Sequence, residues 1–154
     1  MTNEPNNPPV RLLVHYQSLC EQEAPDLVVS VPGRAIWAAV RFNRSGYVKV
    51  IDADSKRQVR FTARSARRRE TLLGRPLPAW AGYVAGVLAL IDVDAMPGVE
   101  ILICSDEPAG PRRDHSQGML MAALWHQVNN LPLDENALFQ LAEAARREYV
   151  EQVG

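Results

Sequence analysis

Apolar and polar positions follow two different periods along the chain and divide it into predicted helices and strands. Apolar side chains recur at helical spacing over residues 10–23, which predicts an opening helix. Short runs rich in β-branched residues follow between turn residues, as is typical of strands. The predicted strands span residues 27–31, 35–42, 47–52 and 58–62. Strands joined by connections this short predict an antiparallel meander.

Helical periodicity dominates the second half of the chain. Residues 64–75 are charged and have no apolar period, so we interpret them as a loop or a short exposed helix. A strand is predicted at 99–104 between two helices at 78–90 and 117–128. Asp134 is a favourable N-cap for a last helix. The predicted fold class is α+β, with a mostly antiparallel sheet and helices on one face.

Composition limits the class of protein. A chain of 154 residues with 47% apolar residues is long enough for one domain with a core of its own. We expect a disordered tail at 1–9, which is polar and proline-rich, and a single domain at 10–154. The net charge of −1 gives no global basic excess, so no nucleic-acid partner is expected.

Three further patterns concern location and chemistry. No apolar run approaches the roughly 20 residues of a membrane span, and no signal-peptide pattern opens the chain. The two cysteines, Cys20 and Cys104, lie far apart and are interpreted as reduced thiols. We therefore expect a cytoplasmic protein without a membrane partner. No cluster of histidine, cysteine or acidic residues has the spacing of a metal site, so no structural metal is predicted.

Four separated motifs resemble the N-terminal lobe of galactokinase and, more broadly, of the GHMP sugar kinases. Residues 28–34, VVSVPGR, are similar to the "APGR" strand that follows an opening helix in that family. Residues 80–87, WAGYVAGV, resemble the "W-x-x-Y-x-x-G-V" helix of galactokinases. Residues 105–110, SDEPAG, are similar to the "SD-x-P-x-G" leading into the phosphate loop, and residues 141–150 to the "A-x-x-A-E-x-x-Y/F-V-G" helix. Together these motifs span nearly the whole chain.

The resemblance implies a fold, a pair of cofactors and a set of site residues. Arg34 matches the active-site arginine of the family, and Gly110 and Ser116 match residues of the phosphate loop. ATP and Mg²⁺ are the implied cofactors, with Arg112 beside the phosphates. Trp80 has two interpretations: it stacks on adenine, as the aromatic residue of the galactokinase helix suggests, or it packs on the sheet.

The departures from the family pattern affect both substrates. The sugar-binding hairpin "NLIGEHTDYNGG" that follows "APGR" has no counterpart, so a sugar partner is not expected. Residues 108–119 align with the phosphate loop "P-x-G-x-G-L-S-S-S-A-A-L", but Arg112 replaces its second glycine, and Asp114 and His115 replace two of its serines. The chain also stops at Gly154, before the segment that carries the family's catalytic aspartate and before the C-terminal lobe.

Three hypotheses about function follow. The first is a degenerate galactokinase-like protein in which ATP-dependent sugar phosphorylation is impaired or lost. The second is a binding or scaffold module that presents the face left by the missing lobe to a protein partner or to a second copy. The third is a kinase completed by a separate chain. Two local features have simpler interpretations: Asp114, His115 and Ser116 as a solvated loop, and the basic run over 56–75 as a solvated face.

Overall fold

The structure is a computed structural model and describes residues 8–20, 24–91 and 98–151. Its centre is a sheet with the strand order β1-β2-β5-β3-β4. The strands are β1 (Leu27–Ser30), β2 (Ile36–Asn43), β3 (Val48–Asp52), β4 (Arg57–Phe61) and β5 (Gly98–Ser105). The α+β class is confirmed, and the predicted strands correspond to these within two residues at either end. Residues 1–7, most of the expected tail, lie outside the described residues.

The sheet is mostly antiparallel, as predicted, but its order is not that of a meander. β1 pairs with β2, β2 with β5 and β3 with β4 in the antiparallel sense, whereas β3 and β5 run parallel. The meander prediction is therefore wrong, because β5 is inserted between β2 and β3. The physical reason is that seven of the eight residues of β5 are buried, which suits a central strand covered on both faces.

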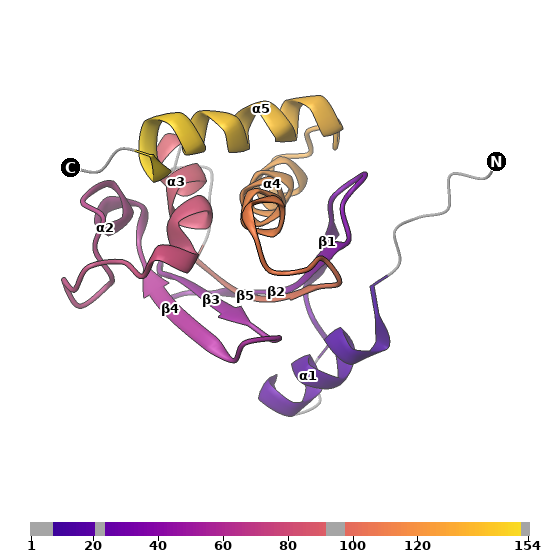
Figure 1. Cartoon of the computed structure of the whole chain (residues 1–154). Helices are drawn as coiled ribbons and strands as arrows, with labels where there is room; N and C mark the ends of the chain where they lie inside the picture. Colours follow the sequence, from indigo (N-terminus) through magenta and orange to yellow (C-terminus); the bar gives the residue numbers. More distant parts are fainter. Residues whose placement is uncertain (1–7, 21–23, 92–97, 152–154) are drawn as a thin grey trace.

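Helices lie on both faces of the sheet, and most of them lie on one (Figure 1). The larger group consists of α2 (Ala63–Arg67), η1 (Ala79–Ala81), α3 (Gly82–Leu90), α4 (Pro111–Val128), α5 (Glu135–Ala145) and η3 (Arg146–Val150). α1 (Val10–Cys20) packs on the opposite face, against β2 and β5. The opening helix and the last helix, with Asp134 as its N-cap, are confirmed. No helix in the described parts of the chain has the length and apolarity needed to cross a bilayer.

β2 contributes alternate residues to two apolar clusters, one on each face of the sheet. Ala38 and Val40 belong to the larger cluster under α3, α4 and α5, which also contains Phe61. Trp37 and Ala39 belong to a smaller cluster with residues of α1 and β5. Cys104 lies in this smaller cluster as a free thiol, and burial, with the nearby charge of Asp54, raises its pKa to about 11. A thiol with so high a pKa is not a nucleophile at neutral pH.

α3, α4 and α5 approach one another closely at a glycine. A Cβ atom built on Gly118 of α4 would lie 3.1 Å from the ring of Tyr83 on α3 and 3.3 Å from the Cβ atom of Ala142 on α5. The missing side chain is thus what lets α4 lie between its two neighbours. The sequence predicts a helix over residues 78–90 with apolar residues on one side. In the structure α3 is buried on almost all sides, and residues 84–88 are all buried.

Candidate functional site

The candidate site lies where β5 ends and α4 begins. Gly110 caps the helix with a φ angle of 152°, in a region that favours glycine, and Pro111 occupies the first turn. The helix therefore begins at residue 111 rather than at the predicted 117. The solvated-loop interpretation of residues 114–116 is wrong, because these residues lie within the first turns of α4, where His115 and Ser116 are buried.

Arg34 reaches this helix terminus from a tight turn before β2. Pro32 and Gly33 form the turn, closed by a 3.1 Å hydrogen bond from the Arg34 amide to the Val31 carbonyl, and Gly33 has a φ of 79°. The guanidinium donates to Ser116 Oγ at 2.9 Å, and this hydroxyl donates to the Arg112 carbonyl at 2.9 Å. Burial, and then the neighbouring charge of Arg112, lower the pKa of Arg34. Three of the site residues predicted from the sequence, Arg34, Arg112 and Ser116, thus lie in contact here.

Trp80 lies apart from this group. It is half-buried, packs against the larger apolar cluster, and has the guanidinium carbon of Arg57 5.0 Å from its ring centroid. None of the contacts between described residues joins its side chain to Arg34, Gly110 or Ser116. The packing agrees with the second interpretation of Trp80, and its role in stacking on adenine stays a prediction.

Carboxylates of the same chain pair with both arginines of the helix terminus. Arg112 Nε donates to Glu107 Oε2 at 3.0 Å, and the Glu107 side chain is only 7% exposed. Arg113 lies 3.0 Å from Asp54 and 3.4 Å from Asp52, which is almost fully buried. From the sequence, the charges of Arg112 and Arg113 would favour a bound phosphate. In the fold, both are already paired with carboxylates.

Sequence reasoning missed Asp52, Asp54 and Glu107. Asp52 ends β3 and Asp54 follows it, and they reach α4 because β3 runs parallel to β5, which places the C-terminal ends of both strands at one edge. Asp54 Oδ2 also accepts a 2.9 Å hydrogen bond from the Ser105 amide at the end of β5. In the expected meander, these carboxylates would not lie beside the end of β5 and the start of α4. Their position after an apolar strand was the signal available in the sequence.

His115 forms a second polar cluster within the helical layer. Its Nε2 lies 2.8 Å from Glu143 Oε2, and its ring contacts those of Tyr83 and Phe139. Arg146 donates to Glu143, and this hydrogen bond lowers the pKa of the Glu143 carboxyl. An ionised carboxylate only accepts, so Nε2 carries the proton, and the buried Nδ1 has no hydrogen-bond partner among the residues that the structure describes. Burial lowers the pKa of His115 more than Glu143 raises it.

We expect the stability of the protein to fall as the pH drops through about 6.5. The folded state holds His115 neutral, with Arg34 and Arg146 also opposing its protonation, whereas the unfolded chain takes up the proton at its ordinary pKa. His115 therefore contributes its full stabilisation above the pKa that it has in the unfolded chain. This contribution is lost as the pH falls toward the lower pKa that it has in the folded protein. Urea unfolding of His115→Gln should show a shallower decline between about pH 7 and pH 5.5. An equal decline in His115→Gln and in the matched variant His126→Gln would contradict this.

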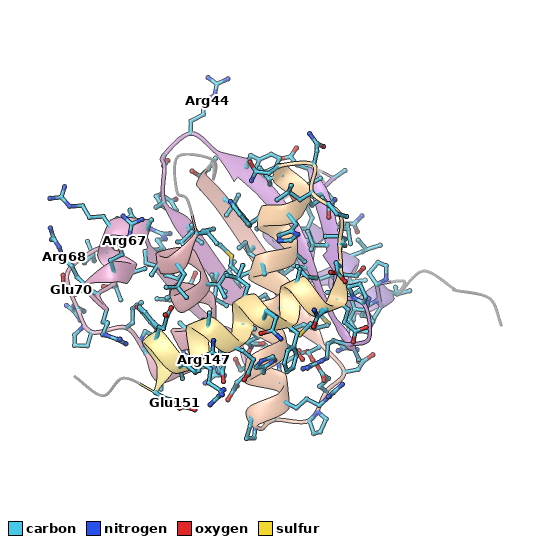
Figure 2. All side chains as sticks on the ribbon, turned by 90° about the horizontal axis from the view of Figure 1, so that it is seen from above. Arg44, Arg67, Arg68, Glu70, Arg147 and Glu151 are labelled. Atoms are coloured by element: carbon cyan, nitrogen blue, oxygen red, sulfur yellow. The ribbon has the colours of Figure 1, made fainter. Side chains whose placement is uncertain are left out.

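The basic run over residues 56–75 does not form one uninterrupted surface. Arg68 points away from the molecule at the end of α2, as Figure 2 shows, whereas Arg67 is exposed but donates a 3.5 Å hydrogen bond to the Ala89 carbonyl. Arg57 and Arg69 instead lie over the rings of Trp80 and Tyr149. The prediction of a solvated face therefore fits the arginines at α2, whereas Arg57 and Arg69 pack on aromatic rings.

Helix geometry and charge together restrict what this site can bind. Pro111 has no amide hydrogen, so the first amides that α4 could offer an anion are those of Arg112 and Arg113. Three carboxylates at this edge are already paired with arginine, those of Asp52, Asp54 and Glu107. No group of three or more histidine, cysteine or acidic residues in ranges 8–20, 24–91 and 98–151 could hold a metal ion.

Solved kinase structures share this fold. One is a mevalonate kinase, with a TM-score of 0.57 at 10% identity over 80% of this chain and 47% of its own. Another is the mevalonate kinase of Methanococcus jannaschii, with a TM-score of 0.56 at 10% identity over 73% of this chain and 36% of its own. Lactococcus lactis galactokinase, solved with galactose, has a TM-score of 0.59 at 16% identity over 79% of this chain and 32% of its own. The chain thus spans less than half of each of these proteins.

These similarities concern the fold. Mevalonate kinase and galactokinase are both GHMP kinases, so the expected GHMP-kinase-like fold is confirmed. No protein-family model matches the sequence, and no curated protein matches it either.

Proposed function

We propose that this chain is a degenerate GHMP-kinase-like domain that no longer transfers phosphate from ATP to a sugar. One observation carries the proposal: both arginines in the first turn of α4, where phosphate would bind, are paired with the chain's own carboxylates. Arg112 pairs with Glu107, and Arg113 pairs with Asp52 and Asp54. A phosphate bound by these arginines would face the same carboxylates at short range, and their repulsion weakens its binding.

The backbone at the helix terminus supports the same conclusion. Phosphate-binding loops present several amide hydrogens, and glycine keeps their backbone free. Here Pro111 removes one donor, and α4 already includes residues 114–116. The Ser116 hydroxyl also donates its single hydrogen to the Arg112 carbonyl, so it has none to offer a phosphate oxygen. The donor set does not fit a magnesium nucleotide, so no catalytic step through ATP follows from this geometry.

The region expected to hold a sugar supports the loss of that substrate as well. The chain turns at Pro32 and Gly33 and enters β2 at Ile36, so the family's hairpin has no equivalent between Arg34 and the strand. A Cβ atom at Gly33 would lie 2.6 Å from Glu135 Oε1, so this turn is in close contact with the start of α5. Arg34 then serves to connect the turn with α4.

Calorimetry and a direct activity assay test the proposal together. With ATP and Mg²⁺ at millimolar concentration, the melting temperature of the wild-type chain should rise by less than about 1 °C, because a ligand stabilises only the state that binds it. No phosphorylated product should form from galactose or mevalonate. ATP-dependent turnover by the purified chain would contradict the proposal.

A matched pair of variants tests the proposed cause. Glu107→Gln removes the charge that neutralises Arg112 and should increase the shift that ATP produces. Asp106→Asn removes a charge from the neighbouring position, where the carboxylate pairs with Arg11, and should leave that shift unchanged. Equal responses of the two variants would argue against self-neutralisation as the reason for weak binding.

A further inference from the structure

A cavity lies beside α1, on the face of the sheet opposite α3, α4 and α5. Its volume is about 570 Å³, within the roughly 300–1,000 Å³ that is usual for small-molecule sites. His15 and Ser18 of α1 form one wall, and Lys49 of β3 with Lys56 of the β3–β4 turn line it from the sheet side. Ile51 and Leu102 contribute apolar surface. α1 covers β2 and β5, so this cavity occupies the part of the face that the helix leaves open.

The two lysines make this cavity unlike the rest of the surface. Only two of the 17 lysine and arginine residues in the chain are lysines, and both line it. An arginine presents a planar fork, whereas a lysine places a compact charge on a flexible stem. Two such ammonium groups beside the ring of His15 suit a compact anionic group that lacks a fixed orientation.

No carboxylate in the described ranges forms an ion pair with either lysine. Asp52 also lines the cavity, but its oxygens face Arg57 and Arg113 and accept hydrogen bonds from the amides of Asp54 and Ser55. Glu100 is level with Lys49 in the strand register and also with Arg41 on its other side. The cavity therefore retains positive charge, unlike the site at the start of α4.

The backbone of Lys56 provides an independent indication. Its φ is 61°, in the left-handed region that glycine occupies without strain and that a long side chain disfavours. Strained positions of this kind persist where the surrounding structure holds them and are often associated with function. Lys56 therefore occupies the position of the β3–β4 turn at which the backbone would favour glycine.

We propose that this cavity binds a small organic anion, a phosphate or carboxylate carried on an apolar body. Lys49 and Lys56 bind the anionic group, and the His15 imidazole and Ser18 hydroxyl supply further hydrogen-bonding groups. Ile51 and Leu102, the latter only 4% exposed, contact the apolar body. Asp52 borders both this cavity and the start of α4, but the groups that bind the anion here, Lys49 and Lys56, form no hydrogen bond or ion pair with the described residues of α4, so the site does not depend on the function proposed there.

Titration with three anions and one neutral control tests the site. We expect phenyl phosphate to bind more tightly than inorganic phosphate and benzoate to bind as well, with phenol, the neutral control, giving no response by calorimetry. The variant Lys49→Gln/Lys56→Gln should bind phenyl phosphate at least tenfold more weakly. The control Arg64→Gln/Arg68→Gln removes the same charge from the exposed surface of α2 and should bind like the wild type. Circular dichroism would verify that both variants are folded.

A single substitution separates binding from a structural role. Lys56→Gly relieves the positive φ, so it should keep or raise the melting temperature while it weakens phenyl phosphate binding. A lower melting temperature together with unchanged binding would overturn the role given to Lys56. No response of the wild type to any of the anions, or an equal loss of affinity in the α2 control, would overturn the site.

Discussion

Replacing Phe61 by alanine should lower the free energy of unfolding by about 3–5 kcal/mol. Phe61 is fully buried in β4, within the apolar cluster that joins the sheet to the helices above it. Truncation loses the transfer free energy of the ring and leaves a cavity that the neighbouring strands and helices fill only in part. Such a loss is a large share of the roughly 5–15 kcal/mol by which folded domains are usually stable.

Urea unfolding of Phe61→Ala and Phe42→Ala side by side would check this expectation. Phe42 lies in β2, is 39% exposed, and belongs to neither apolar cluster, so its loss should cost about 1 kcal/mol or less. Similar midpoints for the two variants, at equal slopes, would contradict the assignment of Phe61 to the core.

Replacing Asp52 by alanine should cost about 2–4 kcal/mol, the second largest effect. Its carboxylate is buried and faces Arg113 and Arg57 at 3.4 Å and 3.5 Å. It also accepts hydrogen bonds from two backbone amides of the β3–β4 turn. The variant leaves these donors without their partner, although Arg113 keeps its pairing with Asp54, which limits the loss.

Asp106→Ala provides the matched comparison for Asp52→Ala. Asp106 also pairs with an arginine, Arg11, but it is half-exposed, and an ion pair in water contributes about 0–1 kcal/mol. Chemical denaturation should therefore separate the two aspartates clearly. Asp52→Asn, which retains one acceptor oxygen for the turn amides, should fall between them. A cost for Asp52→Ala no greater than for Asp106→Ala would mean that the buried network does not stabilise the fold.

Local signals in the sequence predicted the elements well, because the physics of those elements is local. Asp134 caps α5 with its own side chain, which accepts from the Asn136 amide, and Thr62 caps α2 through a box with Ser65. Apolar period and capping residues determine such boundaries within a few positions. At the start of α4, Pro111 in the first helical turn is the local signal that marks where the helix begins.

Strand order and charge pairing were not predictable in the same way, because both depend on contacts distant in sequence. Arg34, Arg112 and Ser116 were identified through the resemblance, and the structure brings them together. Their carboxylate partners come from other elements: Asp52 lies 61 positions from Arg113, and its proximity follows only once β5 is placed beside β3. The burial of His115 and its contact with Glu143 were not predicted for a similar reason, since Glu143 belongs to α5.

The position of β5 has a consequence for synthesis on the ribosome. β1 with β2 and β3 with β4 form two hairpins that are complete early, but only β5 joins them into one sheet. Until residues 98–105 have left the exit tunnel, each hairpin has an unpaired strand edge and an apolar face without cover. The nascent chain therefore depends on its own late segment to close the sheet, and a stall before that segment exposes the edges most prone to aggregation.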